Sequence, residues 1–484
     1  MSTAERAITA SAEVYVDGRW ESPRAGWIED IDPTSGEVFG RAPNADLGQM
    51  ERAVVAARRA ADDGAWAADP QLRANCLKQL SDALFAHRGD VVDLARREYG
   101  VVDAVHTIQI DGPAFMASRG AEHALVPMEY EQETFGAEGR CLIRHEPMGV
   151  VSVITPWNFP HMINVMKLSA ILAGGNTVVL KPSPLTPMIG LALARIIDQH
   201  TDIPDGVVNV VTTDSLTASE LLTTHPGVDM VSFTGSSAVG RTIMTNGGST
   251  MKRLLLECGG KSACILHGDI DVEAILPRLL FDCVTLHSGQ ACILNSRLLV
   301  PEHRRDEVID RLAALAREVV LGDPRDPATR MGPLISAAHR DRVAGMVDRA
   351  VTAGATLVTG GRRRDGLTGF FYEPTILIDV DRSSEIAQEE VFGPVLSVLT
   401  YTDIDDAIAI ANDSPYGLAG SVWSDDDDAA TNIARRMRTG QVTVNGIGPG
   451  DAPYGGYKQS GFGRDGGIGG VRAYTETKAI GVPA

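Results

Sequence analysis

The residues best able to do chemistry in this 484-residue chain are a cysteine, a carboxylate and an amide, which lie in three separate short motifs. Cys292 ends the sequence GQAC, Glu257 lies near the end of the apolar run LLLEC, and Asn158 lies between two prolines in TPWNFP. A thiolate is a good nucleophile, a buried carboxylate can act as a general base, and a side-chain amide can donate a hydrogen bond to a developing oxyanion. Together these residue types predict covalent catalysis at a carbonyl group.

Each of these residues also has an ordinary structural interpretation. A free cysteine is most often an inert buried thiol. Burial of Glu257 could be offset by a salt bridge with Lys252 or Lys261, and Asn158 could cap backbone groups in a rigid turn. The motifs taken one at a time leave these alternatives open.

A different class of enzyme could use the same cysteine. His287 lies five residues before Cys292, so the two could be the base and nucleophile of a cysteine hydrolase. None of the six cysteines lies in a C-x-x-C pair, which argues against zinc-ribbon and thioredoxin-like sites, and we predict no metal. The other five are interpreted as buried thiols: Cys76, Cys141, Cys258, Cys264 and Cys283.

Three further motifs have features that suit a nucleotide. The sequence SFTGSSAVG contains Gly235, Ser236 and Gly240 where a strand passes into a helix, and exposed amides at a helix start favour a phosphate. Its glycine spacing differs from G-x-G-x-x-G, so alone it is more typical of a simple turn. Lys181 ends the strand-like run NTVVLK, and Glu390 lies in EEVFGP, where a carboxylate could bind sugar hydroxyls. The sequence GKS at 260–262 lacks the earlier glycine of a P-loop.

The elements that position these motifs alternate between strand and helix. Amphipathic helices are predicted over 47–62 and 71–98, followed by helices over 189–200, 302–319 and 337–353. Short apolar runs predict one series of strands at 149–155, 176–181, 207–211 and 230–233. A second series is predicted at 254–258, 263–266, 296–300, 374–380, 395–401 and 440–445. This alternation predicts two α/β units with largely parallel sheets.

Composition and charge narrow the function classes. Lys and Arg number 44 against 63 Asp and Glu, a net charge of −19, which argues against nucleic acid or anionic membrane as a partner. The N-terminal sequence has no apolar core of a secretory signal, and no run of about 18 apolar residues predicts a membrane span. We therefore expect a cytoplasmic protein.

Taken in order, these motifs resemble the aldehyde dehydrogenase superfamily over nearly the whole chain, from about residue 15 onward. The matching sequences are TPWNFP, LKPS, SFTGSSAVG, LECGGKS, GQAC, EEVFGP, NDSPYGLAGSVWS and YGGYKQSGFGR. The resemblance implies an α/β fold with a Rossmann-type cofactor-binding domain (1–126 and 147–256), an α/β catalytic domain (257–448) and a small β oligomerisation arm (127–146 and 471–484). It also implies a homodimer or homotetramer.

The resemblance assigns roles residue by residue. Cys292 is the nucleophile that forms a thiohemiacetal and then a thioester, Asn158 helps to hold the oxyanion, and Glu257 activates the water that hydrolyses the thioester. Cofactor-binding residues are implied at Trp157, Lys181, Ser183, Gly235, Ser236, Gly240, Glu390 and Phe392. The substrate tunnel is implied at Phe159, Met166, Ala291, Ile293 and Tyr454, and these mostly apolar residues predict an apolar or aromatic aldehyde rather than an acidic semialdehyde.

The chain departs from the family pattern at positions that bear on the cofactor. Pro184 stands where NAD-preferring members often carry a glutamate, three residues after the lysine, so the cofactor prediction is NAD with NADP left open. Cys258 stands where leucine is common.

Two other functions compete with the dehydrogenase: the cysteine hydrolase of Cys292 and His287, and a catalytically silent structural relative. The latter fits poorly with the intact catalytic set.

Overall fold

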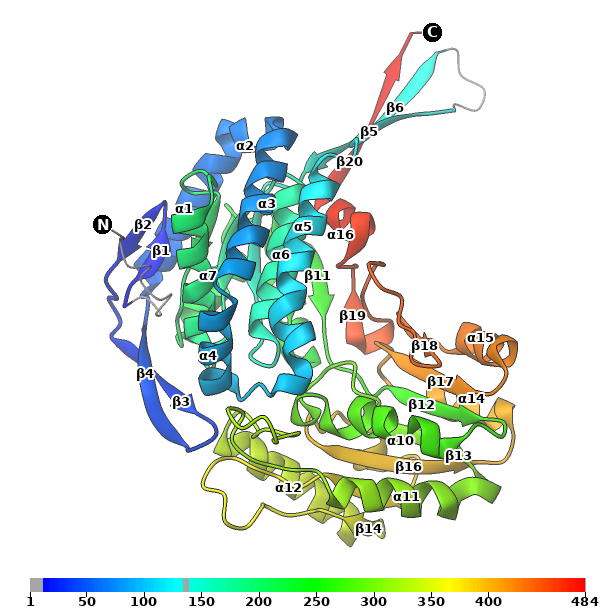
Figure 1. Ribbon diagram of the computed structural model, residues 1–484. Helices are drawn as coiled ribbons and strands as arrows, with labels where there is room; N and C mark the ends of the chain where they lie inside the picture. The colour runs from blue at the N-terminus through cyan, green and yellow to red at the C-terminus, as the bar shows by residue number, and fades with distance from the viewer. Residues whose placement is uncertain (1–11, 134–138, 484) are drawn as a thin grey trace.

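The computed structural model describes residues 12–133 and 139–483 (Figure 1). The first large sheet contains the strands predicted at 149–155, 176–181, 207–211 and 230–233. Its order is β19-β11-β10-β7-β8-β9-β1-β2. The parallel centre consists of β11 (Arg253–Glu257), β10 (Met230–Thr234), β7 (Val150–Ile154), β8 (Thr177–Lys181) and β9 (Val208–Val210). The antiparallel edges are β19 (Gly461–Phe462) on one side and β1 (Val14–Val16) with β2 (Arg19–Glu21) on the other.

The second large sheet forms the other α/β unit, in the order β14-β15-β16-β13-β12-β17-β18. Its strands are β14 (Thr356–Thr359), β15 (Thr375–Ile378), β16 (Val395–Tyr401), β13 (Arg297–Pro301), β12 (Ala263–His267), β17 (Gly420–Ser424) and β18 (Thr443–Val444). All neighbours pair in parallel except β14 with β15. The two parallel units confirm the predicted fold class.

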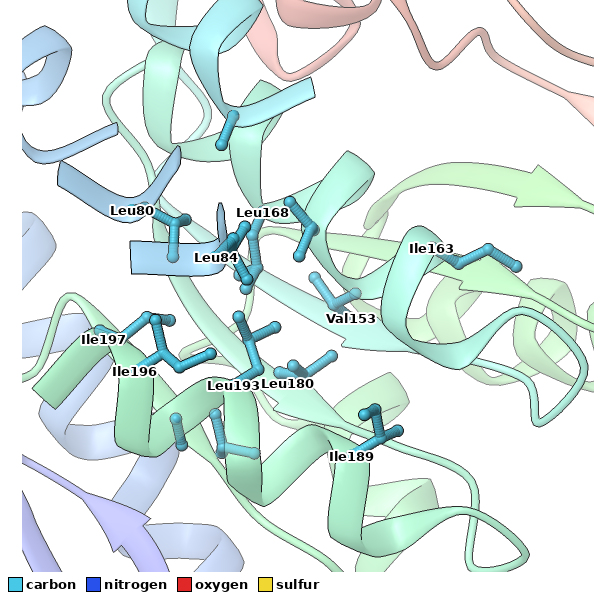
Figure 2. Close-up of a cluster of buried hydrophobic side chains, with 14 of the residues drawn as sticks. Leu80, Leu84, Val153, Ile163, Leu168, Leu180, Ile189, Leu193, Ile196 and Ile197 are labelled. Carbon is cyan, nitrogen blue, oxygen red and sulfur yellow. The ribbon is translucent and has the colours of Figure 1, made fainter. Parts of the chain in front are cut away.

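Helices cover both faces of the first sheet, which explains why its strands are apolar throughout. One face is covered by α3 (Pro70–Ala86), α4 (Arg88–Tyr99), α5 (Gly112–Ala124), α6 (Pro160–Ala173) and α7 (Pro187–His200). In Figure 2, Leu84 of α3, Leu168 of α6 and Leu193 of α7 gather over Val153 and Leu180 of the strands. The opposite face packs against α1 (Leu47–Asp63) and α8 (Leu216–Thr224), with α9 (Ser237–Gly247) beside β10 and β11.

The second sheet is also covered on both faces. One layer contains α10 (Val272–Leu280) and α11 (Arg305–Arg317); the other contains α12 (Ala337–Thr352), α14 (Ile404–Asn412) and α15 (Asp427–Arg436). Short helices complete the fold at α2 (Ala65–Ala68), α13 (Glu385–Gln388) and α16 (Gly467–Ala473). Single turns occupy 103–105, 107–111, 248–250, 281–285, 286–289, 302–304 and 458–460. No helix in the described ranges is both long and apolar enough to cross a membrane.

Two small antiparallel sheets lie outside these units. The strands β20 (Thr475–Val482), β6 (Arg140–Pro147) and β5 (Glu129–Gln132) form an arm that projects from the body in Figure 1. The predicted arm ranges 127–146 and 471–484 contain β5, β20 and all of β6 except Pro147. Residues 134–138 and 484 lie outside the described residues, as do 1–11 of the predicted cofactor-binding domain. The other small sheet is a hairpin of β3 (Trp27–Asp32) and β4 (Glu37–Pro43).

Three predicted elements were wrong in their extent or placement. The strand expected at 440–445 is limited to β18, Thr443–Val444. The helix expected over 71–98 is broken at His87 (φ −98°, ψ 17°) into α3 and α4, near a glycine at 89 that weakens a helix interior. The strand expected at 254–258 was assigned to the second unit, but β11 pairs along β10 from Arg253 to Glu257 and so belongs to the first sheet. The chain crosses between the sheets just afterwards, over 258–262, which is the end of the motif LECGGKS.

Candidate active site

A cavity of about 470 Å³ lies where the two α/β units meet, and both Cys292 and Glu257 line it. Most of the wall is apolar and comes from α5, α6 and the loops around residues 291 and 454. The apolar lining includes Phe115, Met116, Phe159, Met162, Met166, Ala291, Ile293 and Tyr454. All five predicted substrate-tunnel residues are therefore in this lining. The polar side chains Arg119, His123 and Asp451 also line the cavity, and sequence reasoning missed them.

Cys292 lies in the turn that leads into β13 and is half-buried. The preceding backbone is unusual, because His287, Ser288 and Gly289 have φ values of 47°, 57° and 75°. A Cβ on Gly289 would lie 2.1 Å from a backbone atom of Gly393, so only glycine fits there. The Cys292 Sγ lies 3.3 Å from the Tyr454 hydroxyl. Burial, aided by nearby carboxylates, raises the pKa of the thiol to about 12, and the hydrogen bond to Tyr454 opposes that rise.

Glu257 ends β11 and is 3% exposed. Neither carboxylate oxygen has a hydrogen-bond partner among the described residues. Burial, followed by the charge of Asp465, raises the pKa of Glu257 well above its usual range. The salt-bridge interpretation is wrong for both lysines: Lys252 donates to the carbonyls of His225 and Val228, and Lys261 Nζ has no hydrogen-bond partner in this part of the chain.

Asn158 is 3% exposed and its amide is held in place by backbone. Nδ2 donates a 2.8 Å hydrogen bond to the carbonyl of Gln290, two residues before Cys292. Gln290 is itself fixed, because Oε1 accepts from the Ile335 N–H at 2.9 Å. The capping interpretation of Asn158 is thus correct for one amide hydrogen. Among the described residues the second hydrogen on Nδ2 has no acceptor, and Asn158 lies next to Phe159 of the cavity lining without being part of the lining itself.

His287 is not placed to act as the base of a hydrolase. Its ring is 3% exposed, lies against the rings of Tyr99 and Phe159, and is not part of the cavity lining. Burial lowers its pKa to about 3, so the imidazole has little capacity to take a proton at neutral pH. The hydrogen bond found on Cys292 Sγ is shared with the Tyr454 hydroxyl and not with His287.

The predicted cofactor residues form two groups, one around Glu390 and one around Lys181. In one group, Trp157 and Phe392 pack edge to face with ring centroids 5.3 Å apart. Glu390 Oε1 accepts from the Gly260 N–H at 2.9 Å, and a Cβ on Gly259 would lie 2.1 Å from Glu390 Oε2. The glycine pair of LECGGKS therefore lets the carboxylate lie directly on the backbone. Burial raises the pKa of Glu390 to about 7.

The other group lies at the carboxyl ends of β8 and β10. Lys181 ends β8 with 6% exposure, and burial lowers its pKa to about 8. Its Nζ donates to the Pro182 carbonyl at 3.3 Å, with no other hydrogen bond found within the described ranges. Ser183 Oγ accepts from the Leu185 N–H at 3.2 Å. Ser236, predicted to lie where a strand passes into a helix, is the N-cap of α9, and its Oγ accepts from the Val239 N–H.

The glycines beside that cap allow close packing. A Cβ on Gly235 would lie 2.4 Å from the Phe233 ring, and one on Gly240 would lie 3.0 Å from Cys258 Sγ. The glycine at each position lets α9 begin close to the sheet, with its N-terminus at the carboxyl end of β10.

Sequence reasoning missed the polar contacts that hold the cavity together. Lys167 Nζ lies 2.8 Å from Asp465 Oδ2, and both side chains are fully buried. Arg119 Nε lies 3.0 Å from Asp451 Oδ2 at the cavity. The partners in these pairs are 298 and 332 residues apart, so no local pattern could have joined them. The signal available was a charged residue on an otherwise apolar helix, as Lys167 is on α6.

Comparison with known proteins identifies the same family by a family model and by individual relatives. Residues 20–480 match the model of the aldehyde dehydrogenase family. A geranial dehydrogenase of Castellaniella defragrans is 40% identical over 473 residues, covering 96% of this chain and 98% of that protein.

Solved structures agree with this relationship. Betaine aldehyde dehydrogenase of Staphylococcus aureus, in complex with NAD+, has a TM-score of 0.94 at 33% identity and covers 97% of this chain and 95% of its own. An aldehyde dehydrogenase of Mycobacterium tuberculosis, also complexed with NAD+, has a TM-score of 0.94 at 38% identity, with 98% and 99% covered. The chain therefore belongs to the aldehyde dehydrogenase family and is an aldehyde dehydrogenase of class EC 1.2.1.

Proposed function

We propose that this enzyme oxidises an apolar or aromatic aldehyde to the carboxylic acid with NAD, using Cys292 as nucleophile, Glu257 as base and Asn158 as amide donor. The observation that carries the proposal is the cavity, which has an apolar wall and places a cysteine and an unpaired buried carboxylate in one lining. A cysteine hydrolase is not supported, because His287 lies outside that lining and packs against the rings of Tyr99 and Phe159.

In this mechanism the Cys292 sulfur attacks the aldehyde carbon, and a carbon–sulfur bond forms as the carbonyl π electrons move to oxygen. The second Nδ2 hydrogen of Asn158 and the Cys292 backbone N–H then hold the oxyanion. An amide donor of this type lowers the activation barrier by about 3 kcal/mol. Glu257 takes the thiol proton before attack. Glu257 releases that proton to solvent, so that after oxidation it can take a proton from the water that attacks the thioester. The carbon–sulfur bond then breaks, this second proton passes from Glu257 to the departing thiolate, and the carboxylic acid leaves with the thiol restored.

The residues present fit a dinucleotide. The start of α9 offers backbone N–H groups for phosphate, and the Glu390 carboxylate can accept hydrogen bonds from ribose hydroxyls. The buried Lys181 ammonium has one carbonyl partner in the part of the chain that the structure describes, which leaves it able to bind a ligand. When bound, NAD supplies the acceptor for the hydride that leaves the thiohemiacetal carbon. NAD is proposed over NADP because no further basic residue stands beside Lys181 in the sequence, and the two solved relatives are NAD+ complexes.

An apolar substrate is proposed from the charge balance of the cavity as well as from its wall. Arg119 and His123 are basic residues in the lining, which would favour an acidic substrate if their charge were free. Arg119 is paired with both Asp451 and Glu122, and burial lowers the pKa of His123, which favours its neutral form. The relative at 40% identity is named for geranial.

We also propose that the arm of β5, β6 and β20 joins subunits into a homodimer or homotetramer. All four residues of β5 are exposed, and this strand leaves one edge of the arm sheet unpaired within the described residues. Strand edges of this kind readily pair with another chain. Sedimentation of the full chain and of a variant with Pro substituted for Tyr130 tests the assignment, and a monomer in both would reject it.

The reaction is tested by following nicotinamide absorbance with a panel of aldehydes and either NAD or NADP, without coenzyme A. We expect reduction of NAD with hydrophobic aldehydes and little with succinate semialdehyde. Cys292→Ala should remove activity while binding of NAD, measured by fluorescence, stays within about twofold. Similar turnover of acidic and hydrophobic aldehydes would reject the substrate class, and activity retained in the alanine variant would place the nucleophile elsewhere.

A further inference from the structure

The aromatic ring that lines the cavity beside Cys292 carries a hydroxyl whose position the substrate-tunnel role does not explain. Tyr454 Oη lies 3.3 Å from Cys292 Sγ, and among the described residues this is the hydrogen bond found for that hydroxyl. A ring serving only as an apolar wall needs no hydroxyl aimed at the nucleophile. The contact gives Tyr454 a defined chemical partner at the point where the reaction begins.

The backbone that carries Tyr454 is fixed from behind. The Tyr454 N–H donates to the Asp465 carbonyl at 2.6 Å, and the Asp465 N–H donates to the Tyr454 carbonyl at 2.8 Å. The Asp465 side chain is fully buried and accepts from Lys167 Nζ at 2.8 Å and from the Tyr474 hydroxyl at 2.7 Å. Since these groups are anchored in a dry interior, the ring at 454 has little freedom to move away from the sulfur.

The next residue along the chain contacts the proposed base. A Cβ on Gly455 would lie 2.7 Å from Glu257 Oε1 and 2.6 Å from the Gly463 carbonyl, so this position has no room for a side chain. Two consecutive residues thus contact the two proposed catalytic groups: Tyr454 meets the nucleophile and Gly455 meets the base. The segment 454–455 is therefore part of the catalytic constellation and not only of the substrate wall.

We propose that Tyr454 is a catalytic residue whose hydroxyl donates a hydrogen bond to the Cys292 thiolate. This inference rests on the proposed function, in which Cys292 is the nucleophile. The thiol proton leaves for Glu257, while Tyr454 keeps its own proton throughout. When sulfur attacks, its negative charge passes to the carbonyl oxygen and the hydrogen bond weakens, so the hydroxyl acts by favouring formation of the thiolate.

The charges around the sulfur explain why a donor is needed. Burial raises the pKa of the Cys292 thiol, and the carboxylates of Glu390 and Glu257 raise it further, while Tyr454 lowers it. Burial, with charges at Cys292, Glu257 and Asp465, raises the pKa of Tyr454 well above its usual range. The hydroxyl consequently remains protonated across the working pH range and can donate whenever the thiolate forms.

The test compares Tyr454→Phe with Tyr457→Phe, a matched change three residues along the same segment at a tyrosine with an exposed side chain. The rate of Cys292 alkylation by iodoacetamide is measured from pH 6 to 10, with the modified peptide identified by mass spectrometry. Loss of a hydrogen bond to a charged group lowers the thiolate fraction roughly 10- to 100-fold. Because nucleophilicity rises as thiol basicity rises, we expect alkylation to slow by roughly 4- to 15-fold in Tyr454→Phe and to be unchanged in Tyr457→Phe.

A second measurement separates catalysis from packing. The phenylalanine variant keeps the ring and the backbone pairing with Asp465, so its thermal unfolding midpoint should stay within about 2 °C of the native value. A merely structural wall would change KM for a bulky aldehyde and leave iodoacetamide, a small reagent, unaffected. Equal alkylation rates at Cys292 in all three proteins would overturn the role of Tyr454 and leave the proposed function standing. Alkylation of native enzyme at another cysteine, with Cys292 unreactive, would overturn both.

Discussion

Two ion pairs near the cavity differ in their exposure to water: Lys167 with Asp465, the inner pair, and Arg119 with Asp451, the outer pair. Behind Glu257, Lys167 and Asp465 are both 0% exposed, and the pair extends through the hydroxyls of Ser232 and Tyr474. On the polar side, Arg119 and Asp451 are 48% and 40% exposed. The inner pair has lost its water and must keep every partner, whereas water and salt can replace the outer one.

This difference matches what each end does in the proposed reaction. The inner network sets the charges around Glu257, because Asp465 raises the pKa of that carboxylate and Lys167 lowers it. The outer pair crosses from α5 to the 446–452 loop, where the far end of a substrate would lie. We expect inner substitutions to change chemistry or folding and outer substitutions to change which aldehydes are used.

Glu257→Gln is expected to have the largest effect. Glutamine matches the size of glutamate but cannot accept a proton, so hydrolysis of the thioester should fall about 10²- to 10⁴-fold. An initial burst of reduced cofactor followed by a slow steady state in stopped-flow absorbance would show this. Glu302→Gln, at an exposed glutamate, is the control. An unchanged steady-state rate would mean that another base or another step controls turnover.

The pH dependence of the same reaction has a defined sign. A base acts only when ionised, and burial raises the pKa of Glu257, so the steady-state rate of the native enzyme should rise with pH through that elevated pKa. In Glu257→Gln this rise should be lost. A profile that keeps its shape in the variant would show that the limb belongs to another group.

Lys167→Met should have the next largest effect, on folding stability. It leaves the Asp465 carboxylate buried without its cation, which typically costs about 3–5 kcal/mol. Chemical denaturation measures the loss. Lys167→Met combined with Asp465→Asn removes both charges and should recover most of it, while Lys478→Met breaks an exposed pair with Glu146 and should cost less than about 1 kcal/mol. Equal losses in the buried and exposed lysine variants would contradict the difference between buried and exposed ion pairs.

The same contrast explains how much could be predicted from the sequence. Local signals were sufficient for the alternating strands and helices, for the start of a helix at Ser236, and for the three chemical residue types. Which residues lie close together in space was harder to predict from the sequence. The contact between Tyr454 and Cys292 spans 162 residues and depends on the backbone pairing at Asp465, which no periodic pattern encodes.

The placement of β11 failed for a related physical reason. An apolar run predicts a strand but not which sheet it joins, and the glycines that follow permit the chain to cross at that point. The unpaired oxygens of Glu257 were likewise beyond sequence reasoning, because Lys252 and Lys261 stood at plausible distances along the chain. What decides those interactions is burial, which is a property of the assembled fold.

Asp451→Asn should have the smallest effect on folding and a selective effect on substrate use. Both partners of the pair with Arg119 are well exposed, so stability should change by less than about 1 kcal/mol. The variant leaves Arg119 paired with Glu122 alone and removes one negative charge from the cavity lining, so KM should rise for a bulky hydrophobic aldehyde and fall for an acidic one, with propanal unaffected. Asp406→Asn, which breaks a surface pair with Arg382 remote from the cavity, is the matched control. If each aldehyde has the same KM in the native and the Asp451→Asn enzyme, the substrate stays inside the apolar part of the cavity and the outer pair does not select substrates.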